Sequence, residues 1–269
     1  MPVSTLTHAS FTNLDCEIHY WHRPGTGDKY VLFFHGAILD HRMFDLQLSS
    51  FDDTYHLILW DARGHGQSRL PDGRRFDFGD MISDCLELYK ALGIEKAVLI
   101  GQSMGGQLAQ EIAYYHPEMV ERMVLIGCSR NTGKLTLMEK LTIPIGKLIL
   151  YYFPWKMLTD QVARACGNRE DVREYVKTCS ESLGKAASID IFFGVFACLH
   201  EDTSYRFRQP VLLLFGANDR TGNIRKIAQG WADSDDACVL HMIEDAAHNA
   251  NQDQPEVVNR LIREFVQSV

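Results

Sequence analysis

The stretch Val98-Leu99-Ile100-Gly101-Gln102-Ser103-Met104-Gly105 decides the fold that we predict for this chain. An apolar run reads as a buried strand, the pattern G-x-S-x-G follows it, and residues 107–113 read as a helix. A serine on a sharp turn between strand and helix is exposed, and the first amides of the helix point toward it. Small residues on both sides of Ser103 allow the chain to bend tightly. The stretch therefore predicts an α/β layout with Ser103 as a nucleophile.

Two further apolar strands end in loops that carry the acid and the base that a serine nucleophile needs. Residues 211–217 lead to Asp219, and residues 238–243 are followed by a loop with His248. Catalytic groups in open α/β sheets lie at the carboxyl ends of the strands. An imidazole can take the hydroxyl proton and return it later, and a carboxylate orients the imidazole. We therefore expect Ser103, Asp219 and His248 to form a catalytic triad.

Other acids and histidines compete for these roles. Glu244 and Asp245 lie close to His248 in the sequence, and Asp84 is a third rival acid, but no acid follows the strand that ends at Ile126. Among the other histidines, His241 lies within a strand, where we expect it to be packed.

We call the sharp turn around Ser103 the elbow. Earlier in the chain, the strand at residues 31–34 leads into a turn formed by His35-Gly36-Ala37. Backbone amides at such a turn can stabilise the oxyanion of a tetrahedral intermediate. We expect the amides of Ala37 and Met104 to be these donors. The side chain of His35 is expected to hold the turn by hydrogen bonding.

A fourth motif supports a resemblance to a known family. Residues 60–68, Trp-Asp-Ala-Arg-Gly-His-Gly-Gln-Ser, resemble the D-x-R-G-x-G-x-S loop of a subgroup that holds esterases, enol-lactonases, cofactor-free haloperoxidases and carbon–carbon bond hydrolases. With the elbow and the His35-Gly36 turn, the chain resembles an α/β-hydrolase-fold serine hydrolase over nearly its whole length. The resemblance implies a mostly parallel eight-stranded sheet flanked by helices, an inserted helical cap and acyl transfer by Ser, His and Asp. We expect Asp61 and Arg63 to hold their own loop.

The alternation of strands and helices stops for about 80 residues after the strand at residues 123–126. We therefore divide the chain into a core domain of residues 1–128 and 210–269 and a helical cap of residues 129–209. Five helices are predicted in the cap, at residues 135–141, 145–153, 160–166, 170–183 and 189–199.

Five residues are candidates for contact with the substrate. Ile38 and Gln102 flank the predicted site, and Trp155, Phe192 and Phe193 are cap aromatics that could line an acyl pocket. Packing within the cap explains the aromatics equally well.

Composition excludes several classes of function. The chain has 269 residues, a net charge of −8 and a pI near 5.7, without a basic block, so nucleic acid is not an expected partner. The start carries no secretory pattern, and we expect a cytoplasmic protein. Residues 143–153 are apolar but too short and too interrupted to span a bilayer. We expect no metal or organic cofactor, and a homo-oligomer is left open.

The seven cysteines show no C-x-x-C pair, so we expect free and mostly buried thiols. Cys128 is the thiol expected nearest the site, without a catalytic role.

The leading hypothesis is hydrolysis of small, fairly apolar carboxylic esters or lactones through an acyl-enzyme on Ser103. One alternative uses the same triad for carbon–carbon bond hydrolysis, perhydrolysis or a lyase reaction, with Arg130 or Lys134 holding a substrate carboxylate. Another is a ligand sensor that has kept the fold without turnover. An epoxide hydrolase is disfavoured, because the elbow carries serine where that chemistry uses aspartate.

Overall fold

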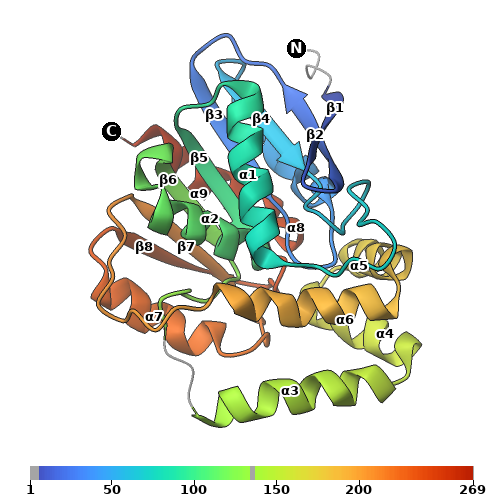
Figure 1. The fold of residues 1–269 in the computed structure, drawn as a ribbon. Helices are drawn as coiled ribbons and strands as arrows, with labels where there is room; N and C mark the ends of the chain where they lie inside the picture. The colour runs from blue at the N-terminus through green and yellow to red at the C-terminus, as the bar shows by residue number, and fades with distance from the viewer. Residues whose placement is uncertain (1–5, 134–136, 269) are drawn as a thin grey trace.

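The computed structural model describes residues 6–133 and 137–268. Its centre is an eight-stranded sheet in the order β1-β2-β4-β3-β5-β6-β7-β8 (Figure 1). The strands β3 to β8 run parallel to one another. Near one edge of the sheet, β2 runs antiparallel to both of its neighbours, β1 and β4. The bounds are β1 Thr7–Asn13, β2 Cys16–Arg23, β3 Lys29–Phe34, β4 Tyr55–Trp60, β5 Ala97–Gln102, β6 Val120–Ile126, β7 Val211–Gly216 and β8 Cys238–Ile243.

Helices cover both faces of the sheet because the central strands are apolar on both sides. In β3, Leu32 and Phe34 face one core cluster with α1 (Phe78–Leu92), α2 (Met104–Tyr115) and α7 (Ile224–Ser234). Val31 and Phe33 face a second cluster with the 3-10 helix η1 (His41–Ser50), α8 (Ala250–Asp253) and α9 (Pro255–Gln267). The two other short 3-10 helices are η2 (Pro117–Met119) and η3 (Val195–Cys198).

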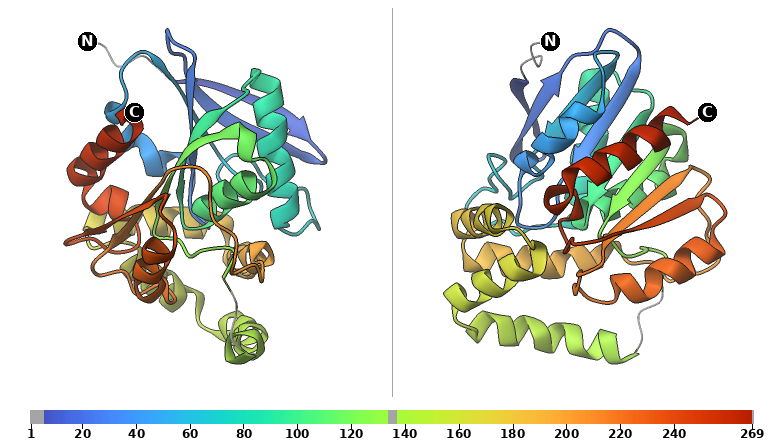
Figure 2. Two further views of the ribbon diagram at one scale, coloured as in Figure 1. Left: turned by 90° about the vertical axis from the view of Figure 1, so that its left-hand side faces the viewer. Right: turned by 180° about the vertical axis from the view of Figure 1, so that it is seen from behind.

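Four longer helices lie between β6 and β7, and we call them the helical insertion. They are α3 (Leu137–Tyr152), α4 (Trp155–Cys166), α5 (Glu170–Leu183) and α6 (Lys185–Gly194). They gather at the end of the molecule where the parallel strands terminate, and α3 is the outermost (Figures 1 and 2). The active site predicted at the carboxyl ends of the strands therefore lies between the sheet and the insertion.

Several predicted elements need correction. The helices predicted at 145–153 and at 135–141, whose first two residues lie outside the described part, are one continuous helix, α3. Its Pro144 removes one backbone hydrogen bond without ending the helix. The helix α4 begins at Trp155, five residues before the predicted start, and α6 begins at Lys185.

At the two edges of the sheet, the sequence prediction missed β1, whereas β8 has the predicted bounds. The predicted packing of His241 is wrong: its strand lies at the edge, and the side chain is exposed. The described part of the chain contains no helix with the length and apolarity that a membrane crossing requires.

Candidate active site

Ser103 lies where β5 ends and α2 begins, in a strained conformation. Its φ and ψ angles are 50° and −114°, outside the regions that most residues adopt. The flanking glycines are required by close approach: a Cβ at Gly105 would lie 1.9 Å from the Phe34 carbonyl oxygen, and one at Gly101 would lie 2.3 Å from the Gly105 oxygen. The elbow is therefore packed tightly against the end of β3, and the strain falls on the serine itself.

The predicted acid and base meet in the structure. His248 Nδ1 lies 2.8 Å from Asp219 Oδ2, and both side chains are buried. Burial raises the pKa of the Asp219 carboxyl, but the hydrogen bond and charge of His248 and the Thr221 amide outweigh burial and hold the pKa below its usual value. An ionised Asp219 accepts a hydrogen bond from Nδ1–H, and this arrangement leaves Nε2 as the ring nitrogen that can act as a base.

Gln102 ties the elbow to the loop that carries His248. Its Nε2 donates to the His248 carbonyl oxygen at 3.2 Å and to Asn249 Oδ1 at 3.3 Å. Gly127, which follows β6, also lies close to His248, since a Cβ at this glycine would lie 3.1 Å from His248 Nδ1. Residues from β5, β6 and the loop after β8 are thereby brought together. Of the rival acids, Glu244 and Asp245 are exposed.

The turn after β3 is held by His35. The ring is buried, its Nε2 accepts from the Ala62 amide at 2.9 Å, and its Nδ1 lies 2.8 Å from the Gly36 carbonyl oxygen. Burial lowers the pKa of His35, and an acceptor Nε2 requires the neutral ring with the proton on Nδ1. The predicted role of His35 in holding this turn is confirmed.

The amides of Ala37 and Met104 have no hydrogen-bond partner among the described residues, which is what a donor to an oxyanion requires. Their role as oxyanion donors stays a prediction. Ile38, which follows Ala37, has a φ of 63°, which is strained for a β-branched side chain. Strain of this kind at both Ser103 and Ile38 favours a functional role for these two turns.

Arg63 and Asp61 hold the loop after β4 in place, as predicted. Arg63 is fully buried and donates to both oxygens of Asp84 at 2.6 and 2.7 Å and to Asp80 at 2.8 Å. Asp61 Oδ1 accepts from the amide of His41 at 2.9 Å and from its Nδ1 at 2.8 Å. Asp84 is therefore committed to Arg63 and unavailable to His248.

The helical insertion is fastened to the His248 loop by contacts that the sequence analysis missed. Asp253, on α8, is buried, and its carboxylate accepts from the amides of Asn168 and Ala247 at 2.9 and 2.8 Å. It also accepts from the Arg169 amide at 3.1 Å. The Asn249 amide donates to the Cys166 carbonyl oxygen at 2.7 Å. We call this set of hydrogen bonds the latch, and it joins the α4–α5 turn to the residues on both sides of His248.

Comparisons with known proteins show the family and the fold. Residues 31–261 match the sequence profile of the alpha/beta hydrolase family. The chain belongs to this family. It is 26% identical to epoxide hydrolase 4 of Homo sapiens over 92% of this chain and 75% of that protein. It is 24% identical to 3-oxoadipate enol-lactonase 2 of Acinetobacter baylyi over 88% of this chain and 89% of that one. A thermophilic esterase from Thermogutta terrifontis superposes with a TM-score of 0.80, 22% identity and 98% coverage of both chains, a likeness of fold.

A buried polar cluster around Glu111, which the sequence analysis of this alpha/beta hydrolase also missed, holds both ends of the helical insertion. Glu111, buried on α2, accepts from Asn131 Nδ2 at 2.7 Å and lies 2.8 Å from His200 Nε2. Burial raises the pKa of Glu111, while Asn131 and His200 oppose the increase. Asn131 precedes the insertion and His200 follows it. One carboxylate therefore fixes the entry and the exit.

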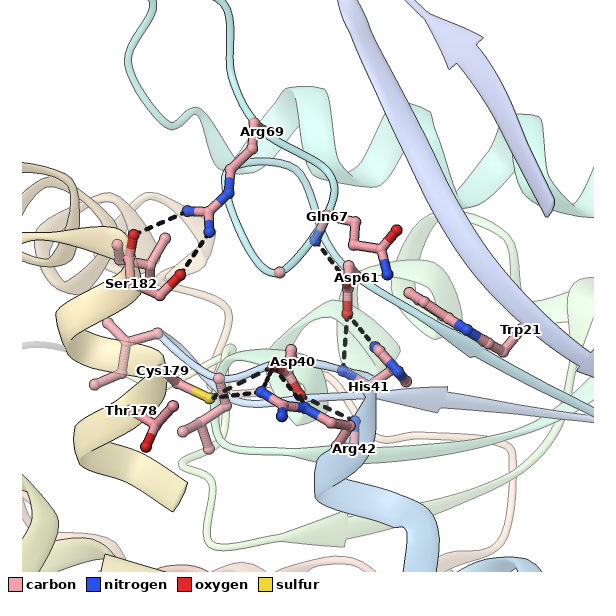
Figure 3. A pocket seen from close by; sticks show the side chains of 14 residues that line it. Trp21, Asp40, His41, Arg42, Asp61, Gln67, Arg69, Thr178, Cys179 and Ser182 are labelled. Carbon is pink, nitrogen blue, oxygen red and sulfur yellow. Dashed lines mark hydrogen bonds and ion pairs between the residues drawn. The ribbon is translucent and has the colours of Figure 1, made fainter. Parts of the chain in front are cut away.

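A pocket of about 380 Å³ opens between the loops after β3 and β4 and the helix α5 (Figure 3). Its wall includes Ile38, Trp21 and two pairs of polar side chains joined by hydrogen bonds, Arg42 with Asp40 at 2.6 Å and Arg69 with Ser182 at 2.7 Å. Ser103, Asp219 and His248 do not line it. The pocket therefore adjoins the predicted oxyanion turn without containing the triad.

The five candidates for substrate contact lie in different surroundings. Ile38 is buried and lines the pocket, and Gln102 is buried and engaged with the His248 loop. Phe192 packs against the second core cluster. Phe193 lies within the insertion, 3.7 Å from the position of a Cβ at Gly146, and Trp155 is half-buried at the start of α4. Contact of these side chains with substrate stays a prediction.

The cationic side chains weighed for other chemistries are also placed. Arg130 donates to the Tyr205 carbonyl oxygen, lies 3.7 Å from Asp235 and covers the ring of Trp231. Lys134 lies outside the described residues. Arg130 is therefore occupied by its own neighbours.

The thiols form no disulfide in the part of the chain that the structure describes. All seven cysteines are free, and five of them are buried. Burial raises the pKa of the Cys128 thiol, which packs against Gly106 of α2. The described residues contain no group of three His, Cys, Asp or Glu side chains arranged to hold a metal ion.

Proposed function

We propose that this alpha/beta hydrolase cleaves carboxylic esters or lactones of small, fairly apolar acids through an acyl-enzyme on Ser103. The observation that carries the proposal is the strained Ser103 at the start of α2, with the His248–Asp219 pair held against the same elbow by Gln102. A nucleophile, its base and an orienting acid are the parts that acyl transfer requires.

In the proposed reaction, His248 Nε2 takes the hydroxyl proton as Ser103 Oγ attacks the substrate carbonyl. The amides of Ala37 and Met104 stabilise the oxyanion, and the N-terminus of α2 adds to this field. His248 then gives the proton to the leaving alkoxide, and an acyl-enzyme remains. Water, deprotonated by His248, attacks the acyl carbon and releases the acid and the free hydroxyl of Ser103.

Serine favours esters and lactones over epoxides for a chemical reason. Attack of Ser103 on an epoxide would form an ether, which offers water no carbonyl to attack. An acyl-enzyme does offer a carbonyl, so the cycle can close. The similarity to an epoxide hydrolase therefore supports the shared family, and the serine supports the ester chemistry that we propose.

Because Arg130 is engaged with Asp235 and the Tyr205 carbonyl oxygen, it is a poor candidate to hold a substrate carboxylate, the role that the carbon–carbon bond alternative gave to Arg130 or Lys134.

We also propose that residues 129–209 act as a cap over the site. The latch and the Glu111 cluster support this proposal, because they attach the helical insertion to the core. A cytoplasmic location stays a prediction.

The test is hydrolysis of p-nitrophenyl esters from acetate to decanoate by the wild type and by Ser103→Ala. We expect turnover by the wild type and a loss of at least about 10⁴-fold in kcat for the variant. Equal rates for both proteins would refute the role of Ser103. Saturable ligand binding with no turnover of any ester or lactone would favour the sensor.

A further inference from the structure

The outer helix of the insertion exposes an apolar face. Among the described residues with large exposed hydrophobic side chains, half lie within residues 145–157. Four of them, Ile145, Leu148, Ile149 and Tyr152, are spaced i, i+3, i+4 and i+7, so they share one face of α3. Their exposed fractions run from 57% to 77%. We call these four residues the outer stripe.

The opposite side of α3 packs against α6. The outer stripe is therefore the exposed face of a helix that is held in place on its other side. Lys147 Nζ lies 2.8 Å from Asp190 Oδ1 on α6, and Gly146 packs against Phe193. Lys185 donates to the Phe153 carbonyl oxygen at 2.8 Å. Figures 1 and 2 show α3 at the end of the molecule farthest from β1. The outer stripe is therefore free to meet a large flat surface.

Charge and aromatic residues indicate the kind of surface. Residues 145–157 contain no acid, although the whole chain has a net charge of −8, and of their two lysines Lys147 is paired with Asp190 on the anchored side of α3. Lys156 is exposed beside the exposed Met157. Tyr151 is 61% exposed next to Tyr152 at the end of α3. Exposed apolar side chains beside a lysine and interfacial aromatics, as found here with Lys156, Tyr151 and Tyr152, are typical of helices that lie on anionic lipid membranes.

A second copy of the chain is the other occupant to consider. The outer stripe and Tyr151 together expose roughly 600 Å² of apolar surface, at about 200 Å² for a large side chain. A standard protein interface buries about 800 Å² on each partner, of which somewhat over half is apolar, so the area allows either occupant and the choice rests on Lys156 and the tyrosines. We propose that the outer stripe docks the protein on the surface of a membrane that contains anionic phospholipid.

The first experiment measures binding of the full chain to large unilamellar vesicles by co-sedimentation. The vesicles are phosphatidylcholine alone or phosphatidylcholine with phosphatidylglycerol at a ratio of three to one. We expect the wild type to bind the mixed vesicles, and Leu148→Ser with Ile149→Ser to weaken binding at least tenfold. The matched control changes two exposed leucines far from α3, Leu14→Ser with Leu46→Ser, and keeps wild-type binding.

A charge variant and an activity assay complete the design. Lys156→Glu is expected to weaken binding to the mixed vesicles severalfold, with little change on phosphatidylcholine alone. All variants should keep the wild-type circular dichroism spectrum. The outer-stripe variant should also keep hydrolysis of soluble p-nitrophenyl acetate, so a failed docking proposal and a failed hydrolase proposal give different results.

Two outcomes would overturn docking on a membrane. One is absence of wild-type binding to the mixed vesicles, or equal binding by the outer-stripe variant. The other is a concentration-dependent dimer, measured by light scattering, that Leu148→Ser with Ile149→Ser abolishes while vesicle binding is unchanged. The second outcome would assign the outer stripe to a second copy of the chain.

Discussion

Acid sensitivity that depends on His65 is a direct prediction from burial. The ring is fully buried, its Nδ1 lies 2.9 Å from the Arg63 carbonyl oxygen, and its Nε2 has no hydrogen-bond partner. Burial lowers the pKa of His65 from 6.5 to about 3. The folded protein therefore holds the ring neutral where the unfolded chain protonates it.

The sign of the effect follows from linkage. Because the folded pKa lies below the unfolded value, the unfolded chain binds the extra proton between pH 6.5 and about 3. Stability is complete above about pH 6.5 and falls by up to ~1.4 kcal/mol for each unit of pH below it. Between pH 7 and pH 5, His65 alone should lower the free energy of unfolding by about 2 kcal/mol.

The perturbation is His65→Asn, which keeps an amide donor for the Arg63 carbonyl oxygen and removes the titration. Urea unfolding followed by circular dichroism gives the free energy of unfolding at pH 7 and at pH 5. The variant is expected to be less stable at pH 7, because a smaller side chain leaves a cavity. Its loss of stability between the two pH values should nevertheless be about 2 kcal/mol smaller than that of the wild type.

The comparison isolates one ring. His35, which is also buried, is present in both proteins, so its own pH dependence cancels to first order. His241→Asn, at an exposed position, is the matched control and should keep the wild-type pH dependence. Equal losses between pH 7 and pH 5 in the wild type and His65→Asn would refute the reasoning.

Three further predictions test the site and its attachment. Asp219→Asn is expected to lower kcat for p-nitrophenyl acetate by about 10⁴-fold, because the amide no longer holds His248 in the required tautomer. Asp253→Asn should lower kcat by about 10- to 100-fold with KM within about twofold, because the latch positions the His248 loop. Glu111→Gln should lower the free energy of unfolding by about 1–3 kcal/mol, measured in urea, because it weakens a buried acceptor.

Each of these predictions has a result that contradicts it. An Asp219→Asn enzyme with nearly wild-type kcat would assign the orienting acid elsewhere. If Asp253→Asn changed stability alone and left kcat and the pH profile of kcat/KM unchanged, the latch would be structural only. Unchanged stability in Glu111→Gln would remove the argument that this carboxylate fixes the insertion.

The sequence was sufficient to predict the parts of the fold that depend on local pattern. Apolar strands that end in glycine turns placed Ser103, Asp219 and His248 at one edge of a mostly parallel sheet, and the structure brings the last two within 2.8 Å. Signals of the same local kind bound α1, since Asp77 caps its start and Gly93 ends it in a left-handed conformation. These signals act over a few residues and can be read from the chain directly.

What the sequence did not reveal depends on contacts between distant backbone groups. Asp253 looked like an ordinary acid before the last helix, because its partners are amides 84, 85 and 6 residues away. Glu111 stood in an apolar helix without a visible partner. The continuity of α3 through Pro144 was missed because a proline inside a helical pattern normally indicates an end.

The attachment of the insertion divides it into two parts with different duties. The α4–α5 turn is joined by the latch to the residues around His248, so displacement of this turn would displace the proposed base. The helix α3 packs against α6 through Lys147 and Gly146, and none of these contacts reaches the proposed triad. A surface that binds the outer stripe could therefore shift α3 while the latch keeps His248 on Asp219. On this argument the Leu148→Ser with Ile149→Ser variant should lose membrane binding and keep the kcat for soluble esters.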